Sequence, residues 1–258
     1  MKIYAFAAGG LANRMQCIDS GVALARRLDC EIATFWMKNN ELYAEFHELF
    51  QPIRGLEIIT ERPWHAMETL RARQEDTLIV STEGLRSLPV DPEFWASYNY
   101  GSYCNIVFQT NARFCYSYRG ETVFHTNEAL QAEIDRQAAK AQGRVGVHIR
   151  RTDNNISIDQ SPTDAFTRYM DGVPDERFFL CTDDPEEAET LSKRYPRRIA
   201  TPDDRTLRRD LPEGIKAAVV DLMLLAQTKY IVGSAGSSYS LTAAYMGRIP
   251  LHIARKWG

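Results

Sequence analysis

The segment with the clearest chemical potential is Val145–Asp153, in which an apolar, β-branched run ends in a histidine, two arginines and an aspartate. Such runs are typical of strands buried in a parallel sheet, and ligands of open α/β sheets bind just beyond the carboxyl ends of their strands. The planar guanidinium of arginine can grip two phosphate oxygens at once. We therefore interpret Arg150 and Arg151, flanked by His148 and Asp153, as a phosphate-binding segment. A strand that ends in solvated charges is the alternative.

Two glycines follow the apolar stretch near the N-terminus. Gly9 and Gly10 would let the backbone approach a ligand closely, and the free N–H groups of a following helix favour negative charge. Asn13 stands where we expect the N-cap of that helix. The spacing matches neither the Gly-x-Gly-x-x-Gly dinucleotide fingerprint nor a P-loop. We interpret these residues as a second ligand-binding segment, with a simple tight turn as the alternative.

Small residues and hydroxyl groups gather in Gly233–Ser240. Ser237, Ser238 and Tyr239 lie at the predicted start of a helix, where hydroxyls and free N–H groups can cradle a phosphate. A serine-capped helix after a flexible turn explains the same residues about as well. The absence of a Gly-x-Ser-x-Gly elbow argues against Ser-His-Asp hydrolysis.

Another buried strand is predicted to end in two neighbouring carboxylates, Asp183 and Asp184. One of them is expected to be the N-cap of the helix that begins at Pro185. The other could accept hydrogen bonds from a nucleotide base or a ribose. Like the first three segments, this one lies where a predicted strand passes into a helix, and together the segments indicate a nucleotide held between two α/β lobes.

Composition narrows the functional classes. The chain has 258 residues and a formal net charge of −3, so no global basic field attracts nucleic acid. The arginines around Arg205 are interrupted by acidic residues, which favours a solvated surface segment. No metal site is expected, because Asp-x-Asp is absent and the histidines are isolated from one another. No apolar run approaches the roughly 20 residues of a membrane span. The five cysteines are scattered, which favours reduced thiols in a cytoplasmic protein (Cys17, Cys30, Cys104, Cys115, Cys181).

Strand-like and helix-like patterns alternate along the chain, which predicts βαβ units and parallel sheets. Strands are predicted at 2–8, 31–36, 77–81, 144–149, 177–181 and 229–233, and helices at 13–28, 127–141, 163–170, 185–194, 215–227 and 237–246. A boundary near residues 142–143 separates two such regions. The aromatic residues of the middle region could stack on a sugar, but at this density most are expected to form a hydrophobic core (Trp64, Phe94, Trp95, Tyr98, Tyr100, Tyr103, Phe108).

Taken in order, these segments resemble the motifs of the GDP-fucose-dependent fucosyltransferases, the superfamily of α1,6- and protein O-fucosyltransferases that includes the nodulation enzymes. The likeness covers roughly residues 143–247 and, more thinly, 1–36. His148–Asp153 resembles the first motif, and Cys181–Pro185 is similar to a strand end of the α1,6 branch. Asp221–Ala226 through Gly236–Ser240 resembles the last two motifs, and Gly10–Arg14 the N-terminal glycine-asparagine loop.

The resemblance implies an α/β, GT-B-like fold with two Rossmann-like domains facing a central cleft. Residues 1–142 would form the N-terminal, acceptor-side domain, and residues 143–258 the domain that binds the nucleotide sugar. It implies inverting, metal-independent transfer of L-fucose from GDP-fucose to a glycan acceptor, with no cofactor. The short chain without a predicted anchor suits a bacterial-type enzyme that acts in the cytoplasm. The alternatives are another nucleotide sugar, or a non-catalytic module that binds nucleotide sugars.

The resemblance also implies roles for individual residues. Arg150 would hold the β-phosphate and stabilise the departing GDP, and Arg151 would support that pocket or contact the donor. Asn13 would reach the sugar or the diphosphate. The nearest carboxylate to the position of the base in the α1,6 branch is Asp159. The remaining roles are guanine and ribose recognition by His148 and Asp221, and phosphate binding by Ser237 and Ser238.

Overall fold

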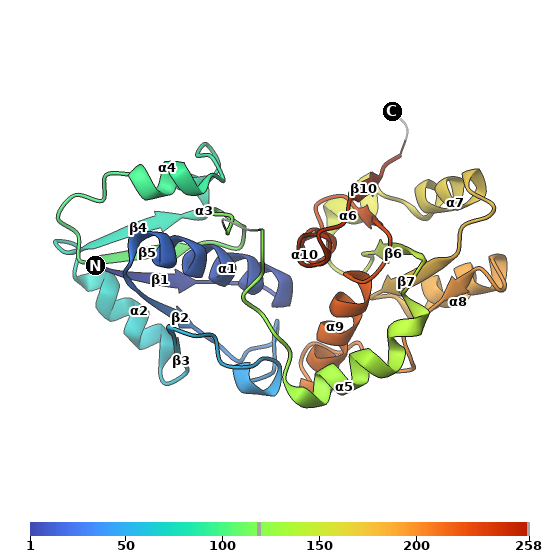
Figure 1. Cartoon of the computed structure of the whole chain (residues 1–258), viewed down its shortest axis with the longest axis horizontal. Coiled ribbons are helices and arrows are strands. Elements are labelled where there is room, and N and C mark those ends of the chain that lie inside the picture. Colours follow the sequence, from blue (N-terminus) through green and yellow to red (C-terminus); the bar gives the residue numbers. More distant parts are fainter. Residues whose placement is uncertain (118–119, 257–258) are drawn as a thin grey trace. The chain divides into compact units, whose positions relative to one another are not determined.

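The computed structural model describes residues 1–117 and 120–256, and the chain divides into two compact units (Figure 1). Unit 1 comprises Met1–Asn127 and Arg209–Ile215, and unit 2 comprises Glu128–Arg208 and Lys216–Gly258. Each unit contains a parallel, five-stranded sheet. The predicted α/β class, with one Rossmann-like sheet in each part of the chain, is thereby confirmed. Among the described residues, no helix is long and apolar enough to cross a membrane.

The sheet of unit 1 has the strand order β3-β2-β1-β5-β4. Its strands are β1 (Lys2–Phe6), β2 (Glu31–Phe35), β3 (Leu56–Ile59), β4 (Thr77–Ser81) and β5 (Asn105–Gln109). Its helices are α1 (Leu11–Leu28), α2 (Pro63–Ala72), α3 (Thr82–Leu85) and α4 (Pro92–Ser97), with a 3₁₀ turn, η1 (Phe46–Glu48). Phe6 packs with Met67 and Leu70 of α2, whereas Ala5 lies beneath Gly21 of α1. Successive β1 side chains therefore contact helices on opposite faces of the sheet.

The aromatic middle of the chain belongs to unit 1, and the predicted core holds for part of it: Trp95, Tyr100 and Phe108 are buried, and Phe94 and Tyr103 are partly buried. Trp95 and Phe108 are fully buried, and the ring of Phe108 stacks on that of Phe114 at 4.1 Å. Trp64 and Tyr98 differ, because 57% and 37% of their surfaces are exposed.

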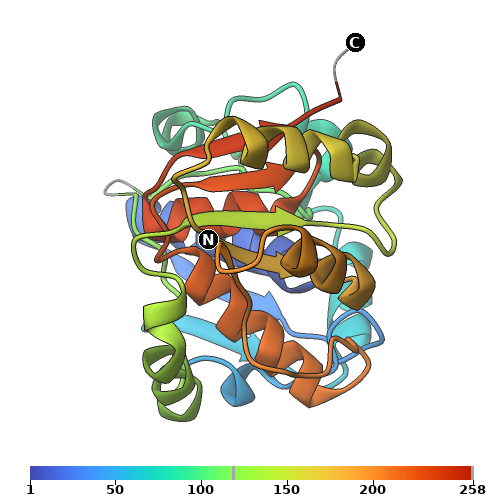
Figure 2. The same ribbon diagram turned by 90° about the vertical axis from the view of Figure 1, so that its right-hand side faces the viewer.

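The sheet of unit 2 has the order β10-β9-β6-β7-β8, with β6 at its centre. Its strands are β6 (Val145–Ile149), β7 (Phe178–Thr182), β8 (Ile199–Ala200), β9 (Ile231–Ser234) and β10 (Leu251–Ala254). Its helices are α5 (Glu128–Gln137), α6 (Asn155–Gln160), α7 (Thr163–Gly172), α8 (Pro185–Arg194), α9 (Pro212–Leu225) and α10 (Ser238–Gly247), with the 3₁₀ turn η2 (Ala138–Lys140). The first turn of α9, up to Ile215, is grouped with unit 1. Helices α7 and α8 cover one face of this sheet, and α9 and α10 cover the other (Figures 1 and 2).

This topology determines where a ligand can bind. From β6 the chain proceeds to β7 and β8 on one side and later to β9 and β10 on the other, so the strand order reverses between β6 and β9. Open α/β sheets bind ligands beyond the carboxyl ends of the strands at such a reversal. Every residue of β6 is buried, since helices cover both faces, and this explains its continuous apolar sequence.

Two local predictions need correction. The division between the units lies at Asn127–Glu128 instead of at residues 142–143, because α5 is bound to unit 2. Its Arg136, together with the following Lys140, forms ion pairs with Asp203. Asn13 is not an N-cap: α1 begins two residues earlier, with Gly10 in the cap position and no side-chain cap. A helix N-terminus needs no side-chain cap when water or a ligand can accept hydrogen bonds from its free backbone N–H groups.

Candidate functional site

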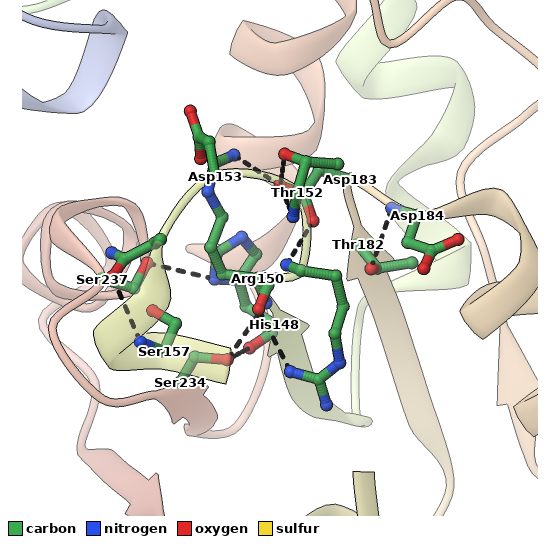
Figure 3. Close-up of polar contacts among 12 residues, drawn as sticks. His148, Arg150, Thr152, Asp153, Ser157, Thr182, Asp183, Asp184, Ser234 and Ser237 are labelled. Carbon is green, nitrogen blue, oxygen red and sulfur yellow. Dashed lines mark hydrogen bonds and ion pairs between the residues drawn. The ribbon is translucent and has the colours of Figure 1, made fainter. Parts of the chain in front are cut away.

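The candidate site lies at the carboxyl ends of β6 and β9 in unit 2 (Figure 3). After Ile149 the chain leaves β6, and the backbone N–H of Arg150 donates to the hydroxyl of Ser234 at the end of β9 (3.0 Å). The loop from Arg150 to Asn154 then leads into α6. Asn154 caps this helix by accepting from the N–H of Ser157, and its side-chain amide donates to the carbonyl of Gly236. The β6 and β9 loops are therefore hydrogen-bonded together.

Asp183 holds the arginine loop in place (Figure 3). Its carboxylate accepts from the backbone N–H groups of Arg151 (2.7 Å) and Thr152 (3.3 Å) and from the Thr152 hydroxyl (2.7 Å). Burial raises the pKa of Asp183, but the Thr152 hydrogen bond and the charge of Arg150 outweigh it, so the pKa lies below its ordinary value. Asp184 instead caps α8, by accepting from the N–H groups of that helix's first turn. The predicted N-cap is therefore Asp184, whereas Asp183, for which a base or a ribose was the expected partner, accepts hydrogen bonds from the arginine loop.

The guanidinium of Arg150 lies between two carboxylates. Its Nη1 is 2.7 Å from Asp183, and its Nη2 forms an ion pair with Asp153. Only 20% of the Arg150 side chain is exposed, whereas Asp153 is 53% exposed. The mostly buried Asp183 thus orients the guanidinium, while Asp153 occupies the edge nearer to solvent. An anionic ligand could replace Asp153 there without disturbing the support from Asp183.

Arg151 supports the site from within the protein. Its guanidinium donates to the carbonyls of Arg150 and Ser161 (3.1 and 3.0 Å) and to the Thr163 hydroxyl, and it pairs with Glu187 at 3.3 Å. These bonds engage the guanidinium with the loop and with α8. Of the two roles predicted for Arg151, the structure favours support of the pocket.

His148 is buried and electrically neutral. Its Nδ1 lies 2.8 Å from the Ser240 hydroxyl, and its ring stacks on Tyr239 at 4.7 Å. Burial lowers the pKa of His148 to about 4, although the charge of Asp183 raises it. A Cβ on Gly233 would approach the Ser240 Oγ to 2.5 Å, so glycine is required for Ser240 to reach the histidine. The neutral imidazole can therefore donate or accept a hydrogen bond, but it is a poor base at neutral pH.

The start of α10 combines structural and accessible groups. Ser237 is its N-cap, and the Ser237 hydroxyl also lies 3.4 Å from His148 Nδ1. Tyr239 donates its hydroxyl hydrogen to the carbonyl of Ala218 on α9. That hydroxyl is thus engaged with α9, and the contribution of Tyr239 to this site is the stacking on His148. Ser237 and Ser238 are partly exposed at a helix N-terminus, a position that favours phosphate.

Asp221 on α9 is the second carboxylate of unit 2 that the sequence assigned to nucleotide recognition. It is buried, with 5% of its surface exposed, and its Oδ2 accepts from Nε and Nη2 of Arg205. Burial raises the pKa of Asp221 to about 6, although Arg205 lowers it. Arg205 was expected on a solvated surface. It is instead partly buried and forms an ion pair with Asp221. This pairing could not be predicted from the sequence, because Arg205 stands among other charged residues.

The glycine loop of unit 1 is built around an arginine that sequence reasoning did not single out. Arg14 is fully buried and donates to the carbonyls of Gly9 (2.8 Å) and Met37 and to the side chain of Asn39 (2.9 Å). Gly9 has a φ of +87°, and a Cβ there would lie 2.6 Å from the side-chain nitrogen of Asn13. Gly9 and Gly10 thus form a turn that the buried Arg14 holds through the carbonyl of Gly9. Asn13, beside this turn, is partly exposed.

Asp159, the predicted base, does not join the group around Arg150. It lies on the surface of α6, where its carboxylate pairs with Lys256 at 2.7 Å and 68% of its side chain is exposed. Among residues 1–117 and 120–256, no group of three or more His, Cys, Asp or Glu side chains is arranged to hold a metal ion.

Comparison of structures identifies the fold of this chain, whereas comparison of sequences identifies no family. No family model matches the chain, and neither does any curated protein. A structure of the α1,6-fucosyltransferase NodZ soaked with GDP-fucose matches 95% of this chain over 92% of its own, with a TM-score of 0.63 and 16% identity. Fucosyltransferase NodZ from Bradyrhizobium gives a TM-score of 0.64 at 15% identity, over 94% of this chain and 92% of that one.

Arabidopsis thaliana FUT1 in complex with GDP matches 98% of this chain over 69% of its own (TM-score 0.63, 13% identity). POFUT1 in complex with GDP matches 98% of both chains (TM-score 0.51, 12% identity). The chain therefore has the two-domain α/β fold of these proteins, and the resemblance seen in the sequence extends to structure over nearly its whole length.

Proposed function

We propose that this chain is an inverting glycosyltransferase that moves L-fucose from GDP-fucose to a glycan acceptor without a metal ion. The observation that carries the proposal is the Arg150 guanidinium, held by Asp183 where the strand order reverses between β6 and β9. The shared fold supports it, because solved structures of that fold are described as fucosyltransferases and some contain GDP or GDP-fucose.

The chemistry follows from where charge develops. In the reaction, an acceptor hydroxyl attacks C1 of the sugar, the bond between C1 and the β-phosphate oxygen breaks, and GDP leaves with an additional negative charge. A preorganised donor aimed at that charge is usually the largest catalytic contribution. Arg150 is such a donor, and the N-terminus of α10 with Ser237 and Ser238 is a second positive region nearby. The proton of the acceptor hydroxyl must pass to a base or to water.

We assign recognition of the guanine and the ribose to Asp221 and His148. A carboxylate is acceptor-only when ionised, so Asp221 suits the N–H donors of guanine, whose N1–H and amino group lie side by side. Adenine presents an acceptor at N1 in place of the donor. The neutral imidazole of His148 can either accept or donate, because its tautomer can adapt to the ligand.

Turnover of a set of donors tests this proposal. GDP-fucose, GDP-mannose and UDP-glucose are each incubated with the protein, with and without EDTA, and released nucleotide is measured by chromatography. We expect slow hydrolysis of GDP-fucose that EDTA does not change, and little release from UDP-glucose. Release from UDP-glucose alone would favour another nucleotide sugar. GDP binding without release from any donor would favour the non-catalytic module, the alternative supported by the pairing of Asp159 with Lys256.

A further inference from the structure

In the ion pair formed by Asp221 and Arg205, one carboxylate oxygen of Asp221 lacks a hydrogen-bond partner within the described residues. Both contacts from Arg205, through Nε at 3.1 Å and through Nη2, go to the same oxygen of Asp221, Oδ2. The other oxygen, Oδ1, is buried and has no hydrogen-bond partner within the described residues. An ionised carboxylate normally places hydrogen bonds on both oxygens, and a buried acceptor left unpaired has lost its water without replacement. A group that the bound ligand supplies would remove that cost.

Arg205 is held firmly enough to impose this arrangement. It lies in the segment after β8, and Asp203 in the same segment forms ion pairs with Arg136 and Lys140. The backbone N–H of Asp203 also donates to the side chain of Gln137 (2.8 Å). Because α5 and the turn after it anchor this segment, the guanidinium reaches Asp221 from a fixed backbone.

We propose that Arg205 is a positioning residue for base recognition: it binds Oδ2 of Asp221, keeps the carboxyl group ionised, and leaves Oδ1 as the acceptor for an N–H group of the nucleotide base. The inference rests on the proposed function, since it takes the ligand to be a guanine nucleotide. Arg205 itself touches no part of the ligand in this scheme and acts through Asp221.

The titration of Asp221 can be measured without interference from its neighbours, because they do not change charge in the same pH range. The titratable groups that interact with it are Arg205, Cys181 of β7 and Tyr239 of α10. Burial raises the pKa of the Cys181 thiol and of the Tyr239 hydroxyl well above their ordinary values, so both stay neutral. His148, stacked on Tyr239, has a pKa of about 4 and is also neutral above pH 5. Within this group, Asp221 alone changes charge near pH 6.

The test is the pH dependence of GDP affinity, measured by calorimetry between pH 5 and 8. Wild type, Arg205→Gln, Arg205→Lys and Asp221→Asn are compared, with Arg194→Gln as a control that removes an exposed arginine of α8. The diphosphate titrates near the same pH, but equally in every protein, so differences between proteins report on the site. Binding that needs the carboxylate weakens as pH falls through the pKa of Asp221, by up to about tenfold per pH unit.

We expect Arg205→Gln to move this midpoint upward by about one pH unit, which weakens binding about twofold at pH 7 and about tenfold at pH 5. Arg205→Lys, which keeps the charge but loses one donor contact, should shift it part of the way, and this variant decides the question if Arg205→Gln does not fold. In Asp221→Asn the pH-dependent component should disappear. If GDP affinity has the same pH midpoint in both Arg205 variants as in wild type, the positioning role of Arg205 is overturned and the proposed function is not affected. Absence of GDP binding by wild type at every pH would overturn the proposed function as well.

Discussion

Replacement of Arg150 by alanine is expected to lower fucose transfer by about 10³-fold while the chain remains folded. The guanidinium is the charged donor placed where β6 ends, and its loss leaves the departing diphosphate without that stabilisation. The backbone N–H of Arg150, which bonds Ser234, is unchanged by the substitution. Rates of GDP release from GDP-fucose, together with thermal unfolding, measure the two effects separately.

Two further variants sharpen this test. Arg150→Lys keeps the charge but loses the forked geometry, so we expect activity between those of wild type and Arg150→Ala. Arg194→Ala removes an arginine whose ion pair with Asp171 is half exposed, and should leave transfer unchanged. Transfer by Arg150→Ala within a few-fold of the wild-type rate would remove Arg150 from the mechanism.

Substitution of the two adjacent aspartates Asp183 and Asp184 should affect transfer differently. Asp183→Ala is expected to lower the free energy of unfolding by about 3 kcal/mol and transfer by about 10²-fold, because it removes the acceptor for two backbone N–H groups and the partner of Arg150. Asp184→Ala removes only the cap of α8. It should cost about 1 kcal/mol of stability and leave transfer unchanged. Denaturant unfolding and donor turnover of both variants provide the measurement.

The pKa values of Asp183 and Asp221 shift in opposite directions, so the effects of the two carboxylates are expected at different pH. Because the folded-state pKa of Asp183 is lowered, its contribution to stability is complete above the ordinary carboxyl pKa of about 4 and is lost on further acidification. A loss of binding between pH 5 and 7 that is absent from Asp221→Asn therefore points to Asp221 and not to Asp183. Equal effects of Asp183→Ala and Asp184→Ala on transfer would contradict the assigned roles.

Local sequence pattern predicted the regular parts of the fold well. The apolar run of β6, the helix over 185–194 and the strand over 77–81 are present within a residue or so of their predicted bounds. These elements are buried against neighbours of regular spacing, so hydrophobic periodicity determines them. The middle of the chain was harder, because β3 and α4 have only 4 and 6 residues, too few to show a clear hydrophobic period.

Site residues were predictable where the strand-end rule applies. His148, Arg150 and Asp183 come from the ends of adjacent strands, β6 and β7, and the structure brings them together at that edge. The structural roles of Arg205 and Arg14 were not predicted, because each arginine binds a partner distant in sequence, Asp221 and the Met37–Asn39 turn. Asp159 was assigned by position relative to a motif alone, and the short helix α6 carries it to the surface beside Lys256. No spacing rule in a single sequence reveals such long-range pairings.

The central claim, a guanine-nucleotide site at the carboxyl end of β6, is tested most directly by calorimetric titration of wild type with GDP and with UDP, each with and without EDTA. We predict GDP binding with a dissociation constant in the micromolar range, about −8 kcal/mol, that EDTA does not alter and that UDP does not match. Preference for UDP, or binding that EDTA abolishes, would contradict both the proposed donor and the metal-independent mechanism.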